Sequence, residues 1–201
     1  MKRVLALPAL LLLLIAVNAY AATSPVDMLE SVANQTLATV KRQGITEKSN
    51  PSAVHRIVYQ IIIPHVDVPG MSRSVINQSI WQSASATQRA RFQKEFTLLV
   101  VRTYSSALAM YSDQQVKFYP VRGGYQNQGR TQVNSIIIRR NAPKIPMSYR
   151  LIYLGGRWQV YDMSVEGVSI LQSFRSQFSS ELSRGEFDAL INKLARRNRG
   201  N

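Results

Sequence analysis

The sequence predicts an α+β fold in which about six helices lie over one face of a curved, four-stranded antiparallel sheet. Apolar residues recur at helical spacing through residues 25–111, and at the two-residue spacing of strands through residues 115–162. Helical spacing returns after Ser169. Strands that are grouped between two sets of helices are typical of this fold class.

The N-terminus has the features of an export signal. Lys2 and Arg3 form a positive start, residues 4–17 form an apolar segment, and an A-x-A cleavage pattern ends at Ala21. The apolar segment is shorter than the roughly 20 residues that cross a bilayer comfortably. We therefore expect residues 1–21 to be a signal peptide that is removed after Ala21.

The remaining residues 22–201 fit one domain with a sizeable core. The chain has no cysteine, which excludes disulfides, cysteine-based zinc sites and cysteine nucleophiles. Subtracting Lys2 and Arg3 from the formal charge of +14 leaves +12. Because export separates the protein from nucleic acid, its anionic partners would be lipid head groups, lipopolysaccharide or acidic protein surfaces, unless the charge only solvates the chain.

Proline and glycine mark the bounds of the first two predicted helices. The first begins at Pro25 and ends at Gly44. The second begins at Pro51, with Asn50 as its N-cap, and ends at Pro64.

Two further features precede the longest helix. The Ile61-Ile62-Ile63 run is apolar on every side of a helical turn, which predicts that it is buried throughout. A short helix over residues 72–80 should follow a Pro69-Gly70 turn, and Trp81 should close it.

The longest predicted helix begins with Ser85 or Thr87 as its N-cap and carries an apolar stripe from Phe92 to Tyr111. Its middle, residues 98–101, is hydrophobic all round. Such a helix is either packed on two sides, or packed on one side and open to an apolar cavity on the other.

Strand periodicity follows. Residues 115–121 and 130–140 predict two strands, separated by a glycine-containing polar loop. A connection with Pro143 and Pro146 leads into two more strands, which completes a four-stranded meander.

The Gly155-Gly156 pair predicts a tight hairpin, because a type I′ turn needs positive φ at both central residues. A two-residue loop would place Tyr153 opposite Trp158 and Tyr149 opposite Asp162. One face of the hairpin would then be apolar and aromatic: Tyr149, Leu151, Tyr153, Trp158 and Val160.

Two helices complete the predicted fold, over residues 169–184 and 186–197. Their inward residues should be Leu171, Phe174, Phe178 and Leu182 in the first, and Phe187, Leu190, Ile191 and Leu194 in the second.

Catalytic motifs are weak. His55 and His65 are the only histidines, and neither lies near a G-x-S-x-G motif. Asp162 and Glu166 could form an acid and base pair, but carboxylates at a strand end more often cap a helix or pair with arginine. No glycine-rich phosphate loop or metal-ligand spacing is present in the sequence.

Several segments together carry a family resemblance. They are Ser85-Ala86-Thr87-Gln88-Arg89 with Phe92 and Phe96, Tyr104 with Ala107-Leu108-Ala109-Met110-Tyr111, and the W-x-V-Y-D-x-x-x-E-G-V-S run from Trp158 to Ser169. The chain resembles the MlaC (toluene-tolerance) family of periplasmic phospholipid-binding proteins over essentially all of residues 22–201.

The resemblance implies a monomeric, non-catalytic periplasmic carrier without a cofactor or a metal. Such a carrier moves phospholipid between an outer-membrane lipoprotein complex and an inner-membrane ABC transporter with an MCE-domain subunit, and so maintains outer-membrane asymmetry. The alternative is a non-catalytic periplasmic adaptor whose basic surface binds an anionic partner.

A carrier of this kind needs an apolar cavity, because two acyl chains of roughly 30 methylenes resist entering water by on the order of 20 kcal/mol. Val168 follows Gly167 where the sheet meets a helix, and we expect this junction to lie near the cavity wall. The predicted lipid-binding residues are Ile76, Trp81, Phe96, Leu99, Val100, Tyr104, Tyr149, Leu151, Tyr153, Trp158, Val160, Val168, Leu171 and Phe174.

Overall fold

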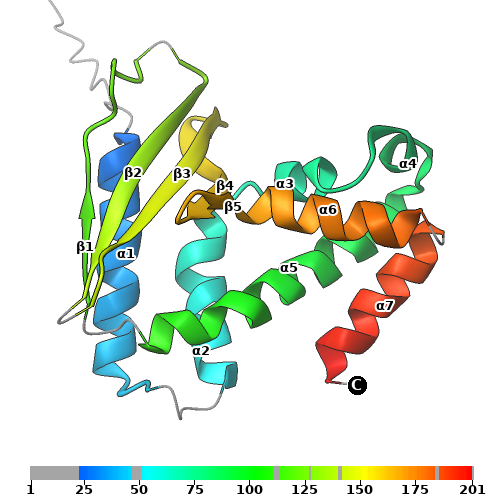
Figure 1. Cartoon of the computed structure of the whole chain (residues 1–201), viewed down its shortest axis with the longest axis horizontal. Helices are drawn as coiled ribbons and strands as arrows, with labels where there is room; N and C mark the ends of the chain where they lie inside the picture. The colour runs from blue at the N-terminus through cyan, green and yellow to red at the C-terminus, as the bar shows by residue number, and fades with distance from the viewer. Residues whose placement is uncertain are drawn as a thin grey trace, which may run out of the picture.

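A computed structural model describes residues 23–46, 51–110, 114–126, 128–139, 142–183 and 186–200. It has an α+β architecture: a curved antiparallel sheet with α1 against it forms one side of the molecule, and a group of helices forms the other (Figure 1). The longest helix, α5 (Ala86–Met110), runs diagonally from the helical side toward the foot of α1 (Figure 1). The predicted signal peptide, Asn50 and Tyr111 lie outside the described residues.

The sheet has five strands in chain order, one more than predicted. The additional strand has two residues and pairs with the end of its predecessor after a turn at Glu166 and Gly167, whose φ angles are 50° and 84°. The strands are β1 (Gln115–Phe118), β2 (Arg130–Ile138), β3 (Ile145–Leu154), β4 (Arg157–Val165) and β5 (Val168–Ser169).

The hairpin between β3 and β4 confirms the glycine signal. Gly155 and Gly156 have φ angles of 56° and 80°, as a type I′ turn requires. Tyr153 lies opposite Trp158, as the sequence predicts.

Further from the turn the predicted register is wrong, because β4 bulges. Arg150 lies opposite Asp162, while the next pair joins Leu151 to Val160, so Tyr161 is an extra residue on β4. The bulge places Met163, instead of Asp162, opposite Tyr149. It thereby keeps a carboxylate off the apolar face of the sheet.

The first two helical segments begin as predicted. The first helix is α1 (Pro25–Arg42), and Gly44 follows it with a φ angle of 62°. The second begins as α2 (Pro51–Ile57), continues as a π turn over Val58–Ile62 and ends as a 3-10 turn over Ile63–His65. Proline at position 64 has no N–H to continue regular hydrogen bonding.

The isoleucine run is less buried than expected. Ile61 is buried, whereas Ile62 and Ile63 are only partly buried. The change from π to 3-10 geometry in this segment means that the three residues do not occupy one regular buried turn.

Two helices replace the single one predicted over residues 72–80. The Pro69-Gly70 pair lies inside α3 (Val68–Ser74), where the Gly70 N–H donates to Oδ1 of the N-cap Asp67 at 2.9 Å. Asn77 caps a new helix, α4 (Gln78–Ser83), so Trp81 lies within a helix and does not close one.

The remaining helices follow the prediction closely. Ser85, and not Thr87, caps α5: it accepts from the Gln88 N–H at 3.1 Å, and its own N–H donates to the Gln88 side chain at 2.8 Å. The last two helices are α6 (Ile170–Leu182) and α7 (Phe187–Arg199). Their predicted inward residues are buried, except Leu182, which is partly buried.

Within the described residues, buried apolar side chains form three clusters. A helical cluster joins α3 to α7: Val75, Ile76, Trp81, Ala84, Phe92, Phe96, Leu99, Ile170, Leu171, Phe174, Phe178, Phe187, Leu190, Ile191 and Leu194. A sheet cluster joins α1 to the sheet: Met28, Leu29, Val133, Leu151 and Trp158. A smaller cluster joins α1 to the α2 segment: Val40, Ile45, Val54, Ile57 and Ile61.

Candidate functional site

The helical cluster is a tightly packed aromatic core. The ring of Phe92 lies 5.7 Å from those of Phe96 and Phe178, and 5.3 Å from that of Phe187. These centroid distances are typical of directly contacting aromatic pairs. Six predicted lipid-binding residues are buried in this cluster: Ile76, Trp81, Phe96, Leu99, Leu171 and Phe174.

The sheet cluster is smaller, and the side chains at its edge are only partly buried. Leu151 and Trp158 are buried in it, and the Trp158 ring lies 5.2 Å from Tyr153 and 6.0 Å from Tyr125. Tyr153 is nevertheless 38% exposed, so it covers the edge of the cluster instead of entering it.

Four predicted residues lie partly buried at the margins of the two clusters. Val100 and Tyr104 pack against the helical cluster, and Tyr149 and Val160 pack against the sheet cluster. Burial raises the pKa of both tyrosine phenols, which keeps them neutral. These margins are the places where an apolar ligand could add to the existing packing without displacing a fully packed side chain.

Met163 was not predicted, yet it connects the two regions. It lies on β4 opposite Tyr149, which packs against the sheet cluster, and it packs itself against the helical cluster. The prediction placed Asp162 at that position because it assumed a regular register. The apolar face of the sheet therefore continues toward the helices through the bulge.

The structure contradicts the expected placement of Val168. This residue is 63% exposed and belongs to none of the three clusters. Its neighbour Ser169 turns inward, where its hydroxyl donates to Asp162 Oδ2 at 2.8 Å. Because adjacent strand residues point to opposite faces, Val168 points outward.

Asp162 joins the sheet to the helices through hydrogen bonds and an ion pair. Its carboxylate is 2% exposed, and accepts from the N–H groups of Met163 at 2.8 Å and Leu171 at 3.2 Å. Arg150 lies 3.6 Å from it on the neighbouring strand. The expected structural role of this carboxylate is confirmed, whereas Glu166 is exposed on the following turn.

The segment before α3 is fixed to the same strand. Val66 forms a parallel bridge with Val160, and the Asp67 N–H donates to the Val160 carbonyl at 2.9 Å. The bulged part of β4 thus holds both α3 and α6 in place.

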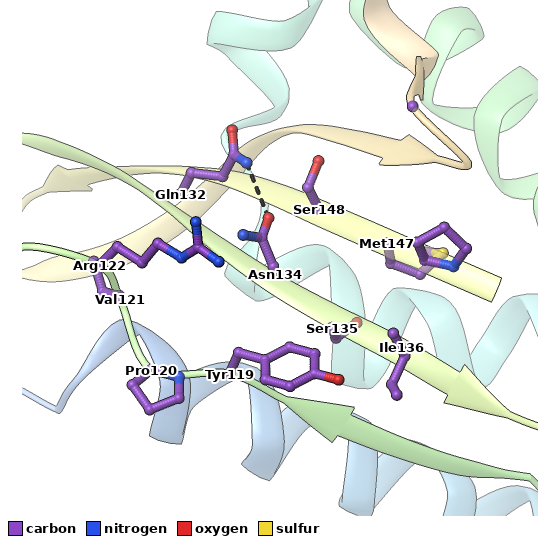
Figure 2. A pocket seen from close by; sticks show the side chains of 12 residues that line it. Tyr119, Pro120, Val121, Arg122, Gln132, Asn134, Ser135, Ile136, Met147 and Ser148 are labelled. Carbon is purple, nitrogen blue, oxygen red and sulfur yellow. Dashed lines mark hydrogen bonds between the residues drawn. The ribbon is translucent and has the colours of Figure 1, made fainter. Parts of the chain in front are cut away.

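Two of the hollows on the described surface bear on ligand binding. The first, of about 700 Å³, lies where β1 departs from β2 and is shown in Figure 2. Its wall mixes polar and apolar side chains: Gln132 is hydrogen-bonded to Asn134 at 2.9 Å, with Arg122 and Tyr119 beside them (Figure 2). Ile136 and Met147 line it as well. None of the predicted lipid-binding residues lines it.

The second hollow, of about 640 Å³, lies over the helical cluster. Two predicted residues, Ile76 and Trp81, line it together with arginines from three helices.

The two histidines lie in one helical segment. His55 lies on α2 and His65 in the 3-10 turn, and burial lowers the pKa of both imidazoles, with smaller contributions from Arg102 and Arg157 respectively. Within the described ranges, no three histidine, aspartate or glutamate side chains gather as a metal site would require. No helix in that part of the chain has the length and apolar character to cross a membrane.

The model of the family described as "MlaC protein" matches residues 30–196. The chain belongs to the MlaC family. It is 30% identical to the toluene tolerance protein ttg2D of Pseudomonas putida, over 84% of this chain and 77% of that protein. It is 29% identical to the intermembrane phospholipid transport system binding protein MlaC of Haemophilus influenzae, over 88% and 83% respectively.

A solved structure extends the MlaC relationship to three dimensions. The phospholipid-binding protein from Ralstonia solanacearum, in complex with a phospholipid, is 26% identical to this chain with a TM-score of 0.79. The match covers 87% of this chain and 97% of the Ralstonia chain.

Proposed function

We propose that this MlaC-family protein is a periplasmic phospholipid carrier. It would exchange phospholipid with an outer-membrane lipoprotein complex and with an inner-membrane ABC transporter that has an MCE-domain subunit, and so maintain outer-membrane asymmetry. The observation that carries the proposal is the Ralstonia structure, which shares this fold over nearly its whole length and contains a phospholipid. The predicted signal peptide, residues 1–21, supports the location.

The acyl chains would lie between the helical and sheet regions. The partly buried side chains at the two margins support this position, because they offer apolar surface that is not yet fully covered: Val100, Tyr104, Tyr149, Val160 and Met163. Covering apolar surface gains about 25 cal/mol per Å², so even partial enclosure of two chains offsets much of the cost of leaving a membrane. The fully buried predicted residues would then support the wall from behind.

The carrier would not be an enzyme. Asp162 is occupied by structural hydrogen bonds, and the two histidines lie at different points of one helical segment without a nucleophile motif. We expect His55→Ala and His65→Ala to leave phospholipid binding unchanged. Hydrolysis of bound phospholipid that either substitution abolished would contradict this part of the proposal.

The experiment that tests carrying is transfer between vesicles. Donor vesicles with a self-quenched fluorescent phospholipid are mixed with unlabelled acceptor vesicles, with and without protein comprising residues 22–201. The proposal expects dequenching that rises in proportion to protein concentration. A rate equal to that without protein would contradict it, and leakage of a soluble dye from the donors serves as the control for membrane damage.

A further inference from the structure

The second hollow gathers positive charge from three separate helices. Arg73 comes from α3, Arg89 from α5 and Arg175 from α6. No aspartate or glutamate lines this hollow. The ion pairs within the described residues use Arg91, Arg150 and Lys193, and so leave these three guanidinium groups uncompensated.

Arg89 is held in position by two contacts, but one of its N–H groups lacks a hydrogen-bond acceptor. Its guanidinium carbon lies 5.9 Å from the centre of the Trp81 ring, and its Nη2 donates to the Gln82 carbonyl at 3.0 Å. Its Nε is buried and has no hydrogen-bond partner. A buried donor without an acceptor is costly, and the remaining N–H groups of a guanidinium that is held in place can donate to an anion in the hollow.

The chemistry of the hollow favours an oxyanion. Arg73 and Arg175 are exposed and Arg89 is partly buried, and the positive charge that they bring to one hollow from three helices favours an anion there. A carboxylate has two oxygens and matches a single guanidinium fork, whereas a phosphate group has enough oxygens to accept from several. The Gln78 and Gln82 amides, which also line the hollow, supply further donors.

The geometry points to a phosphate-binding site formed by Arg73, Arg89 and Arg175. The occupant is a phosphate group, either as free phosphate or as the head group of a bound phospholipid. Because Ile76 and Trp81 in the same wall belong to the helical cluster, the site lies directly beside the apolar core. That a phospholipid head group occupies the site rests on the proposed carrier function, whereas binding of free phosphate does not.

Calorimetry tests whether the site binds free phosphate. Lipid-free protein is titrated with inorganic phosphate at constant ionic strength, alongside Arg73→Gln, Arg175→Gln and the double variant. The site predicts saturable binding that the double variant weakens by about tenfold or more, because charge-assisted hydrogen bonds are lost. Arg56→Gln removes an exposed arginine that lines neither hollow and should bind as wild type does.

Phosphorus NMR tests whether the head group of a bound phospholipid occupies the site. The protein is loaded with phosphatidylglycerol, and the resonance of the bound lipid is compared between wild type, the Arg73→Gln/Arg175→Gln variant and Arg56→Gln. A head group in the hollow would shift its resonance in the double variant only. If loading with phospholipid abolishes the phosphate binding seen in lipid-free protein, this result would also support the head group as the occupant.

The results separate this site from the carrier function. If the protein takes up no lipid, the carrier function fails, and the phosphate titration still decides the site. If neither free phosphate nor the lipid resonance responds to the double variant, the site is overturned. Binding of an oligoglutamate peptide in place of phosphate would overturn it too. Thermal melting of each variant shows whether the fold is kept.

Discussion

The helical region and the sheet region bury apolar surface in different ways. In the helices, Phe92 is 0% exposed and contacts four other aromatic rings, so its surroundings are a solid core. In the sheet, a smaller buried group is bordered by half-buried aromatic and aliphatic side chains. We infer that the helices supply most of the stability, while the margin of the sheet supplies the surface that a ligand can cover.

The largest expected effect is on the helical side. Phe92→Ala should lower the free energy of unfolding by about 3–5 kcal/mol, because it empties the centre of the aromatic core. Leu151→Ala, in the smaller sheet cluster, should cost about 2–3 kcal/mol. Urea denaturation of both variants measures the difference. Equal losses would contradict the view that the helices carry most of the stability.

The second-largest effect is expected at Asp162, which connects the helical and sheet regions. Asp162→Ala should cost about 2–3 kcal/mol, because it leaves the Leu171 N–H and the Ser169 hydroxyl without their acceptor. Arg150→Gln should cost less than about 1 kcal/mol, because the guanidinium is 54% exposed and screened by water. If the arginine change proved the more harmful, the ion pair and not the hydrogen bonds would hold the junction.

A matched pair of substitutions tests the margin. Val100→Thr adds a hydroxyl at the partly buried edge of the helical cluster and should lower retained phospholipid at a stability cost of about 1–2 kcal/mol. Val168→Thr makes the same change at an exposed position and should alter stability by less than about 0.5 kcal/mol. Lipid per mole of protein and thermal melting are measured together. Loss of lipid from the Val168 variant would contradict its outward placement and indicate that Val168 lines the cavity.

The smallest expected effect is a pH dependence. Burial lowers the pKa of His55 and His65 below their ordinary value of 6.5, so the unfolded chain binds more protons in this range. Stability should therefore fall modestly as pH drops below 6.5, and should be recovered above it. His55→Gln and His65→Gln should flatten this part of the profile. Denaturation midpoints between about pH 5 and 7.5 would reveal it, and an unchanged slope in the double variant would assign the dependence to other groups.

The sequence was most informative where one residue type has one conformational use. Gly155-Gly156 predicted the hairpin, and Pro25 and Gly44 marked the ends of α1, because few residues take those backbone angles. The break between α3 and α4 was missed because Pro69-Gly70 was interpreted as a turn. The signal was nevertheless present, since Asp67 and Asn77 are good N-caps and proline fits the first turn of a helix.

The candidate site depended on features that sequence patterns describe poorly. The bulge at Tyr161 has no glycine to mark it, yet it decides which of Asp162 and Met163 faces the apolar side. The outward position of Val168 likewise follows from its pairing in β5, a strand too short to show periodicity. Burial was predicted well for the helices, where long stripes repeat over several turns.

Lipid extraction tests the central claim most directly. Protein comprising residues 22–201 is purified from periplasm without detergent and extracted with organic solvent, and the extract is quantified by mass spectrometry. The carrier account predicts phospholipid in near-stoichiometric amount, with no strong preference among head groups, because apolar walls contact chains and a few arginines contact only phosphate. Protein that remains free of phospholipid, even after incubation with vesicles, would contradict it.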